Sequence, residues 1–337
     1  GTYVGRDGLI KTASNNEPRF DHDPTTGESL GLLIEESRTN LITNSNAPTG
    51  QNFNWNTVTT TDNVLTPDGR LSTVRRLTSS GSDNFTYRMG STTAGSANTN
   101  YTGSVWIRTV SGTVTVTTDM NDQDGRTVSL STDWVRFDST ANTGSGGGSA
   151  YRFFDIYTNT TADLYVWGAQ IEVGAFATSY IPTSGSTVTR DRDTAKITGT
   201  NFTDFYNQNE GTLVLSADIG YLATSNQAAV VFEDTSSQST DLIALGYRVG
   251  GGASGGLGGW YQGNDAQVTY QHHSVGVTAN SEFRQALAYK TDDLASVANG
   301  TTPLTDNSGT LSTSIDRVRF GEYYADGMTS GHIRKLS

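Results

Sequence analysis

The stretch LYVWGAQIEVGAFATSYIPT, residues 164–183, decides the class of fold. Its first half alternates strictly between two faces. One face carries Tyr165, Trp167, Ala169, Ile171 and Val173, and the other carries Val166, Gly168, Gln170 and Glu172. A two-residue period is typical of a β-strand with one buried face. The second half turns to small residues, an aromatic residue and a proline, which do not continue a strand. We therefore expect a long strand that closes one β-sandwich and leads the chain into a second.

The same alternation runs through most of the chain, and helical periodicity is almost absent. It recurs in residues 213–219, 283–290 and 317–323, and in segments such as TVTVTTDM and AYRFFDIYT. Turn-rich segments such as NDQDGR, NTGSGGGS and GGGASGGLGG separate them. Short alternating strands with frequent turns predict an all-β fold of two tandem antiparallel β-sandwiches.

Composition excludes several classes of function. The chain has 337 residues, 34% of them hydrophobic, and a formal net charge of -12 from 34 acidic and 22 basic residues. A nucleic-acid groove needs concentrated Lys and Arg, so we expect no nucleic-acid partner. The absence of cysteine excludes disulfides and thiolate metal sites. No apolar run approaches the roughly 18 residues of a membrane-spanning helix, so we expect no membrane insertion.

The pattern predicts four segments and an extended N-terminus. They are a lead-in segment at 1–43, a first sandwich at 44–183, a linker at 184–199 and a second sandwich at 200–337. The linker, SGSTVTRDRDTAKITG, has turn and charge character. Because the first residue is Gly rather than Met, we expect a processed chain or one taken from a longer protein.

Three passages carry a resemblance to a known family. They are residues 7–45 (DGLIKTASNNEPRF to NLITNS), residues 164–193 (LYVWGAQIEV to TVTRDRD), and the run from FTDFYNQNEGTLVLSADIG to GHIRKLS. The first two resemble the modular adhesion and decoration proteins of tailed bacteriophages, especially marine and cyanobacterial ones. The third resembles laminin-G and concanavalin-like sandwiches. The middle zone, with GSVWIR and VSLSTDWVRFDST, resembles a carbohydrate-binding jelly roll.

The resemblance implies a virion structural protein, such as a tail fibre or a neck or capsid-surface decoration, located at the particle surface. Its implied partners are sister subunits in a homotrimer, other virion proteins and host cell-surface polysaccharide. Laminin-G-like domains in this setting continue past GHIRKL with a further strand. Here the chain ends at Ser337, so we expect either a fragment or a closing strand supplied from elsewhere.

One cluster of residues has the composition of a sugar-binding site. Exposed aromatic faces beside amides and carboxylates bind sugar rings by stacking and hydrogen bonding. The candidates are Trp260, Tyr261, Tyr270, Asn264 and Asp265, in and beside WYQGNDAQVTYQHH, together with Trp55 in NFNWNTV. The alternative is that these tryptophans pack in a core. We interpret Trp106, Trp134 and Trp167 as architectural.

No catalytic set is recognisable, so we expect no enzyme. Neighbouring Glu35 and Glu36 would point to opposite faces of a strand. Asp191 and Asp193 alternate with arginines in the linker, where ion pairing is the simpler interpretation.

Cofactors are not expected either. His272 and His273 are adjacent and would face opposite ways, while His22 and His332 stand alone in the sequence. The segment DMNDQDGRT, residues 119–127, fails the EF-hand spacing. It predicts an acidic hairpin tip, and no motif supports the structural calcium that such rims sometimes hold.

Three functions compete. The first is glycan adhesion by outward-facing sandwiches. The second is a purely structural fibre or collar component whose sandwiches pack against sister subunits. The third is a polysaccharide depolymerase, which needs a carboxylate pair that the sequence does not reveal.

Overall fold

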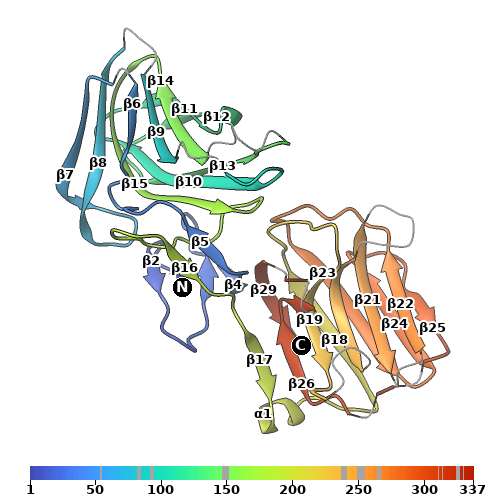
Figure 1. Cartoon of the computed structure of the whole chain (residues 1–337). Helices are drawn as coiled ribbons and strands as arrows, with labels where there is room; N and C mark the ends of the chain where they lie inside the picture. The colour runs from blue at the N-terminus through green and yellow to red at the C-terminus, as the bar shows by residue number, and fades with distance from the viewer. Residues whose placement is uncertain are drawn as a thin grey trace. The chain divides into compact units, whose positions relative to one another are not determined.

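A computed structural model of the chain describes residues 1–53, 55–81, 85–91, 95–145, 152–236, 241–248, 255–263, 267–309, 311–312, 314–323, 327–328 and 330–337. The chain forms two compact units (Figure 1). Unit 1 consists of Gly1–Ser14 and Ser37–Asp191, and unit 2 of Asn15–Glu36 and Arg192–Ser337. The predicted all-β class is confirmed, since the described elements are strands apart from one turn of helix, α1 (Thr200–Thr203). No helix in the described part of the chain has the length and apolar character to cross a membrane.

Unit 1 contains two five-stranded antiparallel sheets. Sheet I has the order β13 (Val135–Asn142), β10 (Asn100–Thr109), β15 (Thr161–Val173), β8 (Leu71–Ser80) and β7 (Thr57–Leu65). Sheet II has the order β12 (Gln123–Leu130), β11 (Val114–Met120), β14 (Arg152–Thr158), β9 (Phe85–Ser91) and β6 (Gly50–Phe53). From β8 onward the chain repeatedly crosses between the two sheets, which is the connectivity of a jelly roll. Buried apolar side chains from both sheets form one core, among them Leu77, Phe85, Val105, Phe154 and Val166.

Two short strand pairs complete unit 1. They are β1 (Thr2–Val4) with β2 (Ile10–Thr12), and β5 (Arg38–Asn40) with β16 (Val188–Arg190). Segments far apart in the sequence therefore share one unit.

The opening stretch forms β15, which lies in the middle of sheet I between β10 and β8. Its predicted faces are correct only as far as Trp167. A β-bulge then interrupts the pairing, because Ser104 pairs with Gln170 while Trp106 pairs with Trp167. Gly168 makes the bulge possible, since its φ is +67° and a Cβ there would lie 2.6 Å from the Trp106 ring. Leu164, Val166, Ala169 and Ile171 enter the core between the sheets, whereas Tyr165 and Trp167 lie outside it.

The residues after β15 fold back onto it, which explains the change of composition. Glu172 is fully buried and accepts two hydrogen bonds from Thr178, from the backbone N–H at 2.8 Å and from the hydroxyl at 2.7 Å. Gln170 accepts the Ile181 N–H at 2.7 Å. Asn40 of β5 donates from its side-chain amide to the Ile181 carbonyl at 2.8 Å. Small and turn-forming residues are needed because the chain must reverse over its own strand.

Unit 2 is a second sandwich of two larger sheets. Sheet III has the order β17 (Ala195–Thr198), β26 (Arg317–Phe320), β19 (Gln227–Glu233), β20 (Leu242–Arg248), β21 (Gly256–Gly263) and β22 (Gln267–His273). Sheet IV has the order β25 (Leu304–Asp306), β24 (Asp293–Ala298), β23 (Phe283–Lys290), β18 (Glu210–Ala217), β29 (Gly331–Leu336), β4 (Ser29–Ile34) and β3 (Phe20–His22). A short pair, β27 (Glu322–Tyr323) with β28 (Gly327–Met328), lies beside β19.

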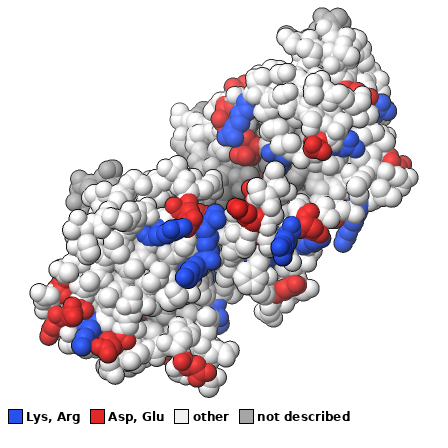
Figure 2. Space-filling model, turned by 180° about the vertical axis from the view of Figure 1, so that it is seen from behind, with Lys and Arg blue, Asp and Glu red and all other residues white. Residues whose placement is uncertain are grey.

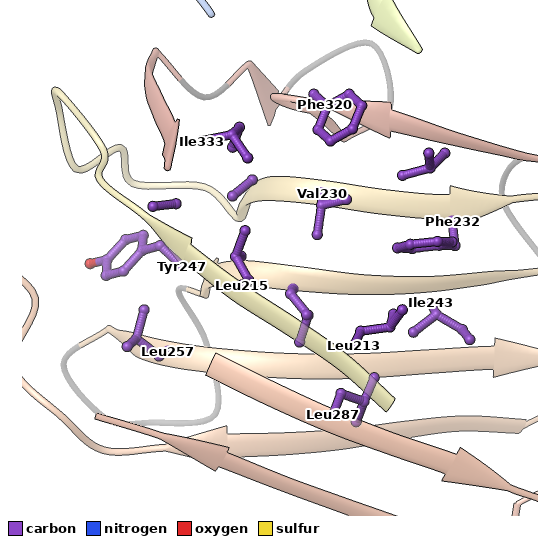
Figure 3. Close-up of a cluster of buried hydrophobic side chains, with 14 of the residues drawn as sticks. Leu213, Leu215, Val230, Phe232, Ile243, Tyr247, Leu257, Leu287, Phe320 and Ile333 are labelled. Atoms are coloured by element: carbon purple, nitrogen blue, oxygen red, sulfur yellow. The ribbon is translucent and has the colours of Figure 1, made fainter. Parts of the chain in front are cut away.

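The core of unit 2 lies between these sheets (Figure 3). Side chains from β18, such as Leu213 and Leu215, point toward Val230, Phe232 and Ile243 of the facing strands. The alternating sequence of β18 therefore works as predicted. Burial of a Leu or Ile side chain of this kind stabilises the fold by about 1.5–3 kcal/mol.

The structure divides the chain differently from the sequence-based boundaries. Residues 1–43 are not a separate lead-in, because β1, β2 and β5 belong to unit 1 and β3 and β4 to unit 2. The predicted linker 184–199 is likewise built into sheets through β16 and β17. Most of these strands have only three or four residues, which is too short for an alternation to be recognised.

Residues 15–36 join the rest of unit 2 through strand pairing and through an ion pair between Arg19 and Asp193. Buried Arg19 pairs with Glu35, with 2.7 Å between Nη1 and Oε2, and also with Asp193. Beyond β29, sheet IV continues into β4 and β3. The strand β29, which contains GHIRKL, therefore lies between β18 and β4 of the same chain.

Candidate functional site

The predicted sugar-binding cluster falls largely outside the described residues. The backbone places Trp260 and Tyr261 in β21 and Tyr270 in β22, and Trp260 pairs with Tyr270 across the two strands. The side chains of these three residues, and the whole of Asn264 and Asp265, lie outside the described residues. A glycan site at this end of sheet III therefore stays a prediction.

The prediction for Trp55 is wrong. Its side chain is 3% exposed and belongs to the core of unit 1, with its ring centroid 5.8 Å from that of Phe85. The polar neighbours in NFNWNTV suggested exposure, but burial of the large apolar indole in the core of unit 1 is favourable and does not require apolar neighbours in the sequence. Trp55 is an architectural residue.

Two of the histidines are held by hydrogen bonds inside unit 2. His273 is buried, with Nε2 at 2.9 Å from the Ser296 hydroxyl and Nδ1 at 2.8 Å from the Thr301 hydroxyl. His332, which stood alone in the sequence, lies between Asp218 and Asp21. Burial lowers its pKa, but hydrogen bonds with the two aspartates and their charges outweigh burial and raise the pKa to about 9.

The acidic hairpin gains a third carboxylate from another strand. Asp119 and Asp122, at the turn between β11 and β12, come together with Asp155 of β14, with ligand oxygens within 4.8 Å of one another. Arg88 of β9 already serves as the counter-ion. Its Nε and Nη2 donate to the two oxygens of Asp155 at 2.9 and 2.6 Å, and Nη2 approaches Asp122 at 3.3 Å.

This arrangement favours an ion-pair network over a metal centre. A cation would have to displace a guanidinium that holds Asp155 by a bidentate pair. Burial, with the charge of Asp155 as the second cause, raises the pKa of Asp119 to about 6. Three carboxylates offer hard oxygen ligands of the kind Ca²⁺ takes, so Asp119, Asp122 and Asp155 are the residues that would hold one.

A different surface has the character of a ligand site, on the outer face of sheet I. Strand pairing aligns side chains from four neighbouring segments, because Arg108 of β10 pairs with Tyr165 of β15, and Tyr165 pairs with Arg76 of β8. Trp134, just before β13, lies on the other side of Arg108. We call Trp134, Arg108, Tyr165, Arg76 and Asp163 the arginine–aromatic row. All five side chains are half-buried.

Arg108 lies between the two aromatic rings of the row. Its Cζ is 5.1 Å from the ring centroid of Trp134 and 4.8 Å from that of Tyr165, which is the range of cation–π contact. One terminal nitrogen donates to the Thr109 carbonyl at 3.1 Å. Burial lowers the pKa of Arg108 from its usual value, against the charges of Tyr165 and Asp133, and the group remains a cation at neutral pH.

The other end of the row is an ion pair. Arg76 donates from Nε and Nη2 to the two carboxylate oxygens of Asp163 at 2.8 and 2.7 Å. The side chains are 38% and 34% exposed, so both remain accessible to a ligand. An exposed pair of this kind contributes little to stability, about 0–1 kcal/mol.

The indole of Trp134 is fixed in place. Its Nε1–H donates to the Leu65 carbonyl at 2.9 Å, at the tip of the β7–β8 hairpin. At that tip Leu65 and Leu71 pair with each other and are 60% and 66% exposed. Behind the row, Trp167 and Tyr180 pack in an apolar cluster that covers part of the same face. The side chains of the row are therefore held in place on one side by the buried cluster and are partly exposed to solvent on the other.

Sequence reasoning did not find this row. It treated Trp134 as a cover for the sandwich and did not single out Arg108 or Tyr165. A usable signal was present, since Arg108 shares strand parity with Trp106, and Tyr165 shares it with Trp167. An arginine that shares a strand face with aromatic residues indicates a partly buried surface, because a core would exclude the charge and a solvent-exposed face would carry fewer aromatic side chains.

Charges elsewhere are mixed. On the face drawn in Figure 2, leaving aside the grey residues, Lys and Arg side chains lie close to Asp and Glu and form no extended basic area. Such a surface differs from the continuous basic footprint of nucleic-acid binding proteins.

Comparisons with known proteins identify no family, because no family model matches the sequence and no curated protein matches it. Solved structures are similar, among them the following three. A CBM40 domain of the Ruminococcus gnavus IT-sialidase, bound to α2,3-sialyllactose, is 16% identical over 43% of this chain and 88% of its own, with a TM-score of 0.33. Mouse laminin α1 domains LG4-5 are 10% identical over 76% and 86%, with a TM-score of 0.29. The tandem CBM22 domains of Paenibacillus barcinonensis Xyn10C are 12% identical over 89% and 99%, with a TM-score of 0.33.

Proposed function

We propose that this chain is a non-catalytic, glycan-binding structural protein of a tailed-bacteriophage virion. The observation that carries glycan binding is the arginine–aromatic row on sheet I. Arg108 lies against one face of each ring, and the half-buried Trp134 and Tyr165 keep part of their apolar surface for contact with a sugar ring. Arg76 and Asp163 offer a donor and an acceptor for the hydroxyl groups of the sugar. A rigid platform of this kind loses little conformational entropy on binding.

The experiment is a glycan array and a pull-down with host envelope polysaccharide. Trp134→Leu and Tyr165→Leu should each reduce binding at least tenfold, since each removes a stacking face. Tyr157→Leu is the matched control, because Tyr157 is a 37% exposed aromatic residue on sheet II, outside the row. Equal binding by all four proteins would place the site elsewhere, and absence of binding to any envelope extract would contradict the proposal.

The same array tests the predicted site at the end of sheet III. Trp260→Leu should leave binding unchanged if the row is the site, and should abolish it if the originally predicted cluster is. The two surfaces lie on different units, so the variants report independently.

The virion role is supported by the resemblance of residues 7–45 and 164–193 to phage adhesion and decoration proteins. Assembly with sister subunits, as a homotrimer, belongs to the same proposal. Placing the chain in a density map of the intact particle tests it directly. Sedimentation of the isolated chain as a monomer would argue against assembly, and an oligomer that binds no glycan would favour a purely structural fibre or collar component.

Polysaccharide cleavage is a second candidate because the structure brings two carboxylates together. Asp119 and Asp155 lie opposite each other on β11 and β14, with one oxygen of each within 4.8 Å of the other, and burial raises the pKa of Asp119 to about 6. Glycosidases use a pair of neighbouring carboxyl groups, one of which acts as a general acid with a raised pKa. Against this, the two residues are only 6% and 2% exposed and Arg88 occupies both oxygens of Asp155. Release of reducing ends from host polysaccharide, abolished by Asp119→Asn, would establish cleavage.

A further inference from the structure

Arg108 differs from the three arginines on the sheets of unit 1 that pair with a carboxylate, and from Arg75, which donates to the carbonyls of Pro48 and Ala47. Arg76 pairs with Asp163, Arg88 with Asp155 and Arg126 with Asp124. Among the residues that the structure describes, no carboxylate lies within 4 Å of the Arg108 guanidinium, and its one hydrogen bond goes to the Thr109 carbonyl. Asp133 therefore acts on this cation only at longer range, and direct contact with a carboxylate is left for a ligand to make.

The surroundings of Arg108 are largely apolar and leave part of its guanidinium without hydrogen bonds. Its Nε is buried and has no hydrogen-bond partner, and the plane of the group lies between the rings of Trp134 and Tyr165. Ring faces compensate a cation less well than water or a carboxylate does. A ligand anion would pair with the terminal nitrogens of this group, because the buried Nε lies out of its reach.

The geometry selects a planar anion attached to a ring. Guanidinium binds carboxylate through two parallel hydrogen bonds, and its five donors exceed what the Thr109 carbonyl uses. A pyranose that carries this carboxylate would lie against Trp134 or Tyr165, with its hydroxyls toward the Arg76–Asp163 pair along the row. A neutral sugar could contact the aromatic rings of the row but would give Arg108 no carboxylate to bind.

We propose that Arg108 binds the carboxylate of a hexuronic acid residue, so that the ligand of the arginine–aromatic row is an acidic polysaccharide. This inference rests on the proposed glycan-binding function and specifies its ligand. It also explains why a protein of net charge -12 would bind a polyanion. The contact is one local cation in a desolvated setting rather than a general attraction, which at this net charge would be repulsive.

The test is isothermal titration calorimetry with oligogalacturonate, oligoalginate and hyaluronan oligosaccharides, each compared with its carboxyl methyl ester. The acid forms should bind at least tenfold more tightly than the esters, which is about 1.4 kcal/mol. Arg108→Gln should lose this preference. Arg108→Lys should also lose most of the preference for the acid forms, because an ammonium group keeps the charge but lacks the two parallel N–H donors of a guanidinium. Arg126→Gln, which removes an exposed arginine from sheet II, should bind like the unaltered protein.

The outcomes separate this inference from the proposed function. Equal affinity for acids and esters, or binding of neutral glycans alone, would overturn the role of Arg108 while leaving glycan binding in place. If Arg126→Gln also lost the preference for the acid forms, the preference would come from the overall charge of the protein, and the proposed role of Arg108 would be overturned. No binding to any glycan, acidic or neutral, would remove both proposals. Thermal unfolding of each variant verifies that the fold is intact.

Discussion

Raising the pH should weaken unit 2 through a single histidine. Protonated His332 donates from Nδ1 to Asp218 at 3.0 Å and from Nε2 to Asp21 at 3.1 Å, and its side chain is 17% exposed. It thereby ties β29 both to the end of β18 and to β3 of the N-terminal segment. Loss of its proton would leave two carboxylates facing a neutral ring, with Arg334 as the remaining cation at Asp218.

The magnitude follows from the two pKa values of His332. The folded value is about 9 and the unfolded value is 6.5, so the folded state holds the proton more tightly. The stabilisation is therefore complete below pH 6.5 and is lost as the pH rises through 9. At 1.36 kcal/mol per pH unit, the difference corresponds to about 3 kcal/mol between pH 6 and pH 10.

Hydrogen-exchange mass spectrometry on peptides covering 210–218 and 331–336 measures this quantity within unit 2. The free energy of opening should fall by about 3 kcal/mol more in the unaltered protein than in His332→Gln over that range. His22→Gln, a neighbouring histidine replacement in β3, should keep the full slope, because Asp21, His332 and Asp218 remain in place. Parallel pH profiles for the unaltered protein and His332→Gln would refute the reasoning.

Three further perturbations test unit 1. Gly168→Ala should lower its stability by about 1–3 kcal/mol in urea unfolding, because φ is +67° and the new Cβ would meet the Trp106 ring; an unchanged midpoint would mean that the bulge is not required. Asp119→Asn should stabilise at pH 7 by up to about 3 kcal/mol and have no such effect below pH 4, since the raised pKa of about 6 makes the charged form unfavourable in the fold; equal effects at both pH values would contradict this. Trp55→Ala should cost about 3–5 kcal/mol of stability, while Trp55→Phe, which keeps a ring against Phe85, should leave glycan affinity unaltered.

Side-chain alternation predicted the fold class because it reports burial directly. In β18 and β23 every second residue enters the core, and these strands could be placed from the sequence to within a residue or two. The alternation failed at Gly168, where a bulge shifts the buried set by one residue. A bulge of this kind depends on backbone conformation and on a partner strand, and neither is visible in a local pattern.

The parts that escaped prediction depend on distant pairing. Strand β4 pairs with β29, which lies about 300 residues away in the sequence, and β3 joins the same sheet through β4. Nothing local therefore marks these two short strands as part of unit 2. His332 stood alone for the same reason, since Asp21 and Asp218 come from two remote strands. In the arginine–aromatic row, each residue type was visible but the cross-strand register that aligns them was not.

The pairing of β4 with β29 sets a condition on how the molecule is made in a cell. Residues 29–34 leave the ribosome about 300 residues ahead of residues 331–336, a delay on the order of 15–60 s at ordinary rates of translation. During that interval β4 lacks its partner β29, whereas the jelly roll, most of which is encoded between β4 and β29, can already fold. Sheet IV can therefore be completed only after the residues of unit 1 have been synthesised, although β3 and β4 were made before most of them. A chaperone that shields β3 and β4 during this interval would raise the yield of correctly folded chains.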